Sequence, residues 1–357
     1  MLTKKLLFLG VHSLCAFIIW MSLSEYSHRS ENKELKALLR LKYSVVEIGC
    51  HLTILEYVSS TWESIWIKNI ANWKSDESDW TNGCMQLEKT KEYVDFFEKY
   101  ASDPLEYLVN FNGELPSNNM LQQVFSHHRV YDSCSKQERL IYIEPLVSFL
   151  RHPGAVCYST DQQDKSYIMI PSSSDIIHKG FKKYFFDVGA SIYNAGAGGD
   201  SQKWFVDNFR LKGIEFDHIY GWEANPTQPS EHWNTVPPDI KRKSSWFNVP
   251  ASSEKGHPDN PWTFVREIAK SKDYVVVKID IDTPLVEVEL VKQLLEDPGL
   301  SSLVDEFYFE HHVHGSPMQF RGWGDLRGQK VSYPGIEDSY KIFQNLREKG
   351  VRAHSWV

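Results

Sequence analysis

The chain has 357 residues, 41% of them hydrophobic and 24% charged, which is enough for one large domain or two smaller ones with a buried core. The formal net charge is −8 and no run of five basic residues occurs, so composition argues against a nucleic-acid partner.

The first 25 residues predict a membrane segment. Two lysines precede an apolar run from Leu6 to Leu23, and about 20 apolar residues span a bilayer as a helix. Basic residues before the run and a polar stretch after it predict a signal anchor. The protein would then be a single-pass type II membrane protein facing the lumen of the endoplasmic reticulum or Golgi. A cleaved signal peptide and a buried core helix remain as alternatives.

Residues 26–180 predict a polar stem and then a mainly helical region without a motif for chemistry. Apolar residues recur at threes and fours from about residue 34 to residue 73, which is typical of a helix. A second helix is predicted over residues 89–100. Residues 138–150 predict an apolar helix or strand that ends before Pro153.

Four cysteines lie in this region, at Cys50, Cys84, Cys134 and Cys157. In an oxidising lumen they would form two disulfides, for which three pairings exist. Four free thiols are the alternative. The CxxC spacing is absent, so neither a zinc ribbon nor a dithiol redox site is indicated.

From residue 181 to residue 357, short apolar β-type runs alternate with helical stretches. This pattern predicts a doubly wound, Rossmann-like α/β domain with a parallel sheet covered on both faces. The predicted strands are 184–188, 218–222, 274–281, 306–310 and 351–357. The predicted helices are 200–210, 261–270, 285–295 and 339–349.

Ligands of such sheets bind beyond the carboxyl ends of the strands, so the residues there are the site candidates. The first strand ends in Asp-Val-Gly-Ala-Ser (residues 187–191) and continues through a glycine-rich loop into a helix. Glycines allow close approach of a ligand, and a helix N-terminus offers free N–H groups. The second strand ends at Glu223, which is placed to accept hydrogen bonds from two ribose hydroxyls. Together these features predict a site for a nucleotide-type cofactor.

Two later strand ends are also polar. Asp280 and Asp282 alternate onto one face after a strand rich in valine, and two such carboxylates share a cation or perturb each other's pKa. The next strand runs into Glu310 and three nearby histidines. The lining of a polar cleft is favoured there over a metal site.

The strand-end sequences FFDVGAS, GWEANP, VVVKIDID and FYFEHH, in this order, resemble the FkbM-like branch of the class I S-adenosylmethionine-dependent methyltransferases. The resemblance covers residues 180–357 and implies methyl transfer from S-adenosylmethionine to an oxygen or nitrogen of a small molecule or glycan. It implies that His311 is the candidate base and Asp280 the runner-up, with Glu223 on the ribose and no metal. The implied cofactor residues are Asp187, Gly189, Ala190, Ser191, Trp222, Glu223 and Ala224.

Some positions depart from the family pattern. Ser191 stands in place of Asn, and Asp282-Thr283 stand in place of Glu-Gly. Two alternatives therefore stay open. One is a metal-dependent glycosyltransferase that uses Asp280 and Asp282, and the other is a non-catalytic scaffold with a methyltransferase-like domain.

Overall fold

The structure is a computed structural model that describes residues 50–72, 77–109, 119–157, 163–176, 181–194, 201–320, 323, 324, 326 and 330–356. The predicted signal anchor lies outside this part of the chain, as do residues 177–180, where the predicted domain boundary falls. None of the described helices is long and apolar enough to cross a membrane. Residues His51–Val357 form one compact unit.

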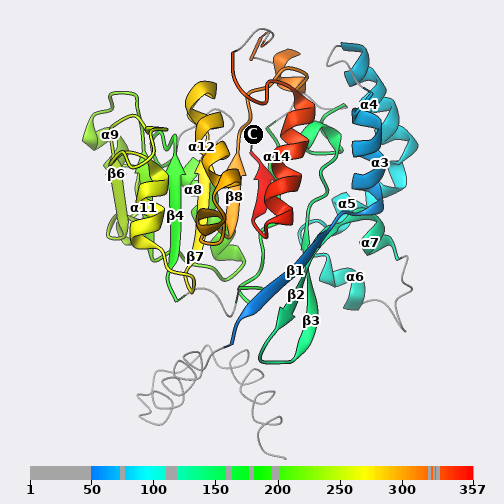
Figure 1. Cartoon of the computed structure of the whole chain (residues 1–357), viewed down its shortest axis with the longest axis horizontal. Helices are drawn as coiled ribbons and strands as arrows, with labels where there is room; N and C mark the ends of the chain where they lie inside the picture. The colour runs from blue at the N-terminus through cyan, green and yellow to red at the C-terminus, as the bar shows by residue number, and fades with distance from the viewer. Residues whose placement is uncertain are drawn as a thin grey trace, which may run out of the picture. The chain divides into compact units, whose positions relative to one another are not determined.

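A six-stranded parallel sheet organises the C-terminal half, which confirms the predicted α/β class (Figure 1). The strand order is β6-β5-β4-β7-β8-β9, and every neighbouring pair is parallel. Strand β7 is buried over its whole length, because it has a strand on each side and lies deep in the sheet. The strands are β4 (Lys183–Val188), β5 (His218–Trp222), β6 (Ser244–Phe247), β7 (Tyr274–Ile279), β8 (Glu306–Phe309) and β9 (Arg352–Ser355).

Helices pack on both faces of this sheet. Tyr308 of β8 contacts Phe205 of α8 (Ser201–Leu211), with ring centroids 4.7 Å apart. The next residue, Phe309, points to the other face, where its ring lies 6.4 Å from Phe343 of α14 (Ile336–Glu348). The other helical segments here are α9 (Pro229–Trp233), α10 (Pro238–Lys241), α11 (Pro261–Ile268), α12 (Pro284–Glu296), α13 (Pro298–Ser301) and the 3₁₀ turn η2 (Pro317–Phe320).

The N-terminal region contains helices and also a three-stranded antiparallel sheet, which the sequence did not predict. Its strands are β1 (Leu52–Val58), β2 (Ser126–Asp132) and β3 (Gln137–Ile143), in the order β1-β2-β3. The first lies inside the stretch predicted as one helix, because pairing with a strand far along the chain outweighs local apolar spacing. Helix α3 (Thr61–Ile70) begins only after Ser60, whose side chain accepts a hydrogen bond from the Glu63 N–H. The other helical segments are α4 (Glu77–Lys89), α5 (Lys91–Tyr100), which was predicted, α6 (Leu105–Val109), α7 (Met120–Val124) and the 3₁₀ turn η1 (Ser148–Leu150).

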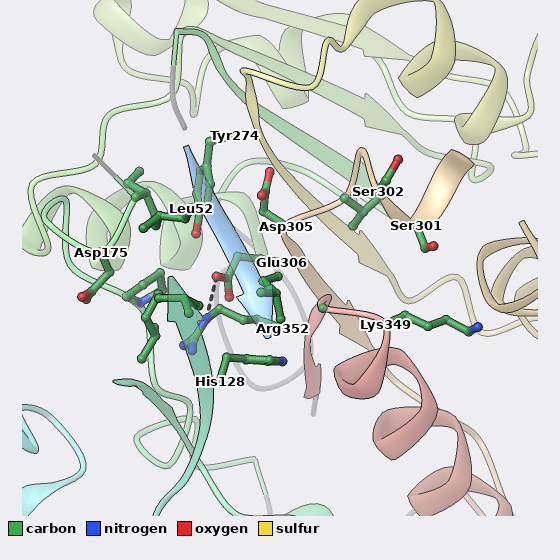
Figure 2. A pocket seen from close by; sticks show the side chains of 17 residues that line it. Leu52, His128, Asp175, Tyr274, Ser301, Ser302, Asp305, Glu306, Lys349 and Arg352 are labelled. Atoms are coloured by element: carbon green, nitrogen blue, oxygen red, sulfur yellow. Dashed lines mark hydrogen bonds and ion pairs between the residues drawn. The ribbon is translucent and has the colours of Figure 1, made fainter. Parts of the chain in front are cut away.

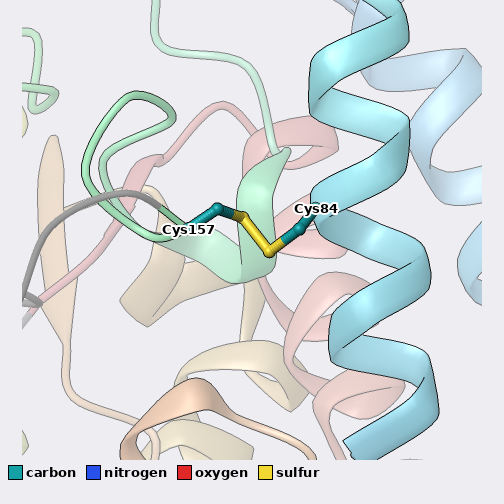
Figure 3. Close-up of a disulfide and its surroundings, with 2 residues drawn as sticks. All are labelled: Cys84 and Cys157. Carbon is teal, nitrogen blue, oxygen red and sulfur yellow. A yellow bond between two sulfur atoms is a disulfide. The ribbon is translucent and has the colours of Figure 1, made fainter.

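Disulfides, and not free thiols, are present in this region. Figure 3 shows Cys84 of helix α4 bonded to Cys157, which follows η1 in the chain. Cys50 and Cys134 are disulfide-bonded as well.

Six charged side chains form a buried charge cluster between the N-terminal region and the sheet edge at β9. Arg347 Nη2 lies 3.0 Å from Glu144 Oε1, and Arg352 Nε lies 2.8 Å from Glu306 Oε1. The His354 ring joins the two pairs, with Nδ1 2.8 Å from Glu144 and Nε2 2.7 Å from Glu306. The sixth member is Glu63, 3.7 Å from Arg347. With His354 protonated, three negative charges face three positive ones, which is how buried charges are tolerated.

Candidate functional site

The carboxyl ends of the central strands meet where the strand order reverses. Val188 of β4 pairs with Trp222 of β5 on one side and with Ile279 of β7 on the other, so the three strands end at the same level. The chain continues from β4 to β5 on one side, whereas β7 and β8 extend the sheet in the opposite direction. Ligands of open α/β sheets bind in the crevice at this point.

The loop after β4 lies against the end of β7. Gly189 has φ +91°, and a Cβ atom there would lie 1.6 Å from the backbone oxygen of Asp280. Only glycine fits this contact. Ser191, two residues on, also has a positive φ of 49°, which is unusual for a residue with a side chain. The glycine-rich residues 195–200 lie outside the described residues.

Glu223 joins this loop to the end of β5. It is 7% exposed. One carboxylate oxygen accepts the Ser191 N–H at 2.7 Å, and the other accepts the Asn225 N–H at 2.6 Å. A carboxylate oxygen has two lone-pair sites, so each oxygen keeps capacity for a hydroxyl. The predicted ribose-binding residue therefore lies at the carboxyl end of β5 and holds the loops after β4 and β5 together.

Three of the predicted cofactor residues lie elsewhere than at the open crevice. The Trp222 ring is buried in the core, 5.1 Å from Phe264 of α11, and Asp187 is fully buried. Ala190 is also fully buried. Ala224, in contrast, is exposed. The side chains of Asp187, Ala190 and Trp222 are therefore packed in the core at the carboxyl ends of β4 and β5.

Lys278 is a site residue that the sequence analysis did not select. Its Nζ donates to the Gly189 backbone oxygen at 2.9 Å and lies 3.2 Å from both Asp187 Oδ1 and Asp280 Oδ2. Burial by itself lowers the pKa of this ammonium, but Asp187 and Asp280 raise it above its ordinary value. The sequence signal for Lys278 is a charged residue inside an otherwise apolar strand, a position that requires buried partners for the charge.

Asp280 and Glu310 form a carboxyl pair across the ends of β7 and β8. Burial and the neighbouring Asp280 charge raise the pKa of Glu310 to about 8. Burial by itself also raises the pKa of Asp280, but Lys278 and the hydrogen bond from Glu310 hold it below its usual range. Two carboxylates this close cannot both ionise without cost. Of the two carboxyl groups, Glu310 is therefore the one whose protonated form is favoured.

The His312 ring lies beside this pair. Its Nε2 is 3.2 Å from Asp282 Oδ1 and 3.7 Å from Glu310 Oε2, and its Nδ1 is 3.5 Å from Glu287 Oε2. Burial by itself lowers the pKa of the imidazole, but the surrounding carboxylates raise it to about 9. The ring lies against Trp323, with centroids 4.4 Å apart and the planes tilted by 38°.

His311, the predicted base, points away from these groups. Its Nδ1 lies 2.8 Å from the Ser339 hydroxyl of α14, and its ring stacks on Phe309. Burial lowers the pKa of His311 to about 3, so the ring is neutral. The structure brings Glu310 and His312 next to Asp280 because the side chains after β8 alternate between the crevice and α14.

Two cations from the N-terminal region reach this site. Arg151 is 4% exposed and Lys165 is 7% exposed, and each interacts electrostatically with Asp280 and Glu310. The Arg151 guanidinium lies over the Trp323 ring, 5.4 Å from its centroid. The region predicted to carry no chemistry therefore contributes charge to the site.

A cavity of about 260 Å³ lies at the other end of the sheet (Figure 2). It is lined by apolar side chains of β1 to β3 such as Leu52, and by residues that flank the starts of β7, β8 and β9. The Arg352–Glu306 ion pair of the buried charge cluster forms part of its lining. Within the described part of the chain, the Tyr274 hydroxyl there has no hydrogen-bond partner. This cavity is remote from the strand ends, which hold the groups capable of chemistry.

No family model, curated protein sequence or solved structure matches this chain, so its functional assignment depends on the geometry of the strand-end site.

Proposed function

We propose that this protein is an S-adenosylmethionine-dependent methyltransferase that acts on an oxygen or nitrogen acceptor. The observation that carries the proposal is the reversal of strand order between β4 and β7, where Gly189 brings the β4 loop against Asp280 and Glu223 holds Ser191. The FkbM-like sequence pattern falls on these strand ends. The cofactor would supply an electrophilic methyl group bonded to sulfur.

The described residues fit such a cofactor. Each oxygen of Glu223 accepts one backbone N–H and retains capacity for one ribose hydroxyl. Asp280, held by Lys278, is our candidate for orienting the nucleophile of the acceptor, because it lies at the switch point. His311 is the weaker candidate, since it faces Ser339.

The proposed location is the lumen of the secretory pathway, behind the predicted anchor in residues 1–25, with a glycan or a small molecule as acceptor. The disulfide between Cys84 and Cys157 supports an oxidising compartment, since disulfides are rare in reducing ones.

Titration of the full-length chain in detergent with S-adenosylmethionine tests the proposal. Wild type should bind, and Glu223→Gln should bind at least about tenfold more weakly, because hydrogen bonds to a charged group contribute about 1.5–3 kcal/mol. Glu231→Gln, on the exposed face of α9, is the matched control and should bind like wild type. Equal affinity for wild type and Glu223→Gln would show that the cofactor pocket lies elsewhere.

A glycosyltransferase is the second candidate, and one observation favours it. Asp282 lies beside His312 and Glu310, so a carboxylate of the Asp280-Ile281-Asp282 motif is near other metal-ligand types. Thermal stabilisation by a UDP-sugar with Mn²⁺, but not by S-adenosylmethionine, would replace the first proposal with this one. Stabilisation by neither ligand at millimolar concentration would favour a non-catalytic scaffold.

A further inference from the structure

Asp282, Glu310 and His312 place three potential metal ligands in one small volume. One ligand atom from each residue lies within 4.8 Å of the other two. The His312 Nε2 lies 3.2 Å from Asp282 Oδ1 and 3.7 Å from Glu310 Oε2. Bonds of about 2.0–2.2 Å to one ion set neighbouring ligand atoms roughly 3–4 Å apart, which matches this spacing.

Glu287 lies on the other side of the imidazole. It is 1% exposed, and its Oε1 accepts the Ile281 N–H at 2.8 Å, which fixes the carboxylate. Its Oε2 lies 3.5 Å from His312 Nδ1. A metal-binding histidine almost always donates its second ring N–H to a carboxylate or carbonyl, which leaves the other nitrogen free to bind the ion. Trp323 packs against the ring at a tilt of 38°, and Nε2 lies 3.2 Å from Asp282 Oδ1, whose side chain is 87% exposed.

Arg151 supplies an independent sign of a missing ligand. Its side chain is 4% exposed, and its Nη1 is buried without a hydrogen-bond partner among the residues that the structure describes. Leaving a buried charged donor unpaired is costly, so such a group usually has an acceptor in the functional state. Arg151 interacts electrostatically with Glu310 and stacks on the same Trp323 ring as His312. An oxygen-bearing anion bound next to the ion would supply the hydrogen-bond acceptor that Arg151 Nη1 lacks.

We propose that Asp282, Glu310 and His312 bind a divalent cation, that Glu287 positions the imidazole, and that the cation and Arg151 together take an oxyanion. Two carboxylates and one imidazole suit Mn²⁺ or Zn²⁺, and open coordination positions on the solvent side remain for the anion. This inference does not depend on methyl transfer, since it concerns a different set of atoms from the Glu223 crevice.

Mn²⁺ titration of the full-length protein, followed by electron paramagnetic resonance without any cofactor, tests the cation half. Wild type should bind one Mn²⁺, and His312→Ala should lose this binding while keeping the circular dichroism spectrum of wild type. Glu287→Gln should bind about 10–100-fold more weakly, the usual effect of removing a group that orients a ligand. The matched control Glu289→Gln, a half-exposed residue on the same helix, should bind like wild type. Absence of Mn²⁺ binding to wild type, or undiminished binding to His312→Ala, would overturn the cation site.

Inorganic phosphate is the probe for the anion half. Bound Mn²⁺ should broaden the ³¹P resonance of phosphate in wild type, and Arg151→Gln should abolish the broadening without changing Mn²⁺ affinity. Unchanged broadening in Arg151→Gln would refute the role of this arginine. The Mn²⁺ measurements use no S-adenosylmethionine, so failure of the cation site and failure of the proposed cofactor site are separate results.

Discussion

Replacement of Arg347 by methionine tests whether the buried charge cluster joins the N-terminal region to the parallel sheet. Arg347 is fully buried. Its guanidinium donates to the Glu144 backbone oxygen at 2.8 Å, the Ala353 backbone oxygen at 2.9 Å and the Tyr57 hydroxyl at 3.0 Å, and it pairs with the Glu144 carboxylate. Methionine fills part of the volume but leaves these acceptors unpaired.

The expected cost follows from the charge balance. Removing one cation leaves three buried carboxylates facing two cations, and breaking a buried pair on one side costs about 3–5 kcal/mol. At about 2 °C per kcal/mol, the low end for a large domain, the melting temperature should fall by about 6–10 °C.

Urea unfolding and thermal melts of the full-length protein at pH 7 measure this loss. Arg266→Met is the matched control, because the Arg266–Asp297 pair is about half exposed and such pairs contribute about 0–1 kcal/mol. A loss for Arg347→Met no larger than that of the control would refute the view that the cluster holds the two regions together.

Two further predictions concern the loop after β4 and the cluster. Gly189→Ala should destabilise the protein well beyond Gly256→Ala in urea unfolding. Both glycines have positive φ, but a Cβ meets the Asp280 oxygen at Gly189 and nothing within 4 Å at Gly256, so equal losses would mean that the contact is not tight. Burial by itself lowers the pKa of His354, but Glu144 and its other carboxylate neighbour raise it above its ordinary value. The protonated ring therefore stabilises the fold fully below about pH 6.5, and this contribution is lost as the pH rises through the folded-state pKa. The urea midpoint of wild type should fall from pH 6.5 to 9 more steeply than that of His354→Gln, and parallel slopes would contradict the assignment.

Local pattern was sufficient for much of the parallel sheet. Strand β5 begins and ends where it was predicted, and β7 is two residues shorter than predicted. Short apolar runs such as these are a local signal for buried strands, and this signal does not depend on which strands pair with them. Strand β6 was missed, since its four residues open with two serines at the sheet edge and are only half-buried. Strand β1 was taken for helix because only its pairing with β2 makes it a strand.

The strand-end residues Glu223, Asp280 and Glu310 were identified from the sequence, because in a parallel sheet the position of a residue along its strand already places it at one edge. The packing of α14 decided which of the two neighbouring histidines lies beside Glu310. The Ser339 hydroxyl of α14 forms a hydrogen bond with His311, and His312 lies next to Glu310.

The sequence alone determined the fold class of the C-terminal half and the edge of the sheet where chemistry is expected, since both depend on short-range periodicity. The tertiary structure decided how charge is distributed there. Arg151 reaches Glu310 from a segment far away in the chain, and Arg347 of α14 meets Glu63 of α3 in the buried charge cluster. Such pairs have no local signature, because the energy that joins them arises only after folding has removed both partners from water.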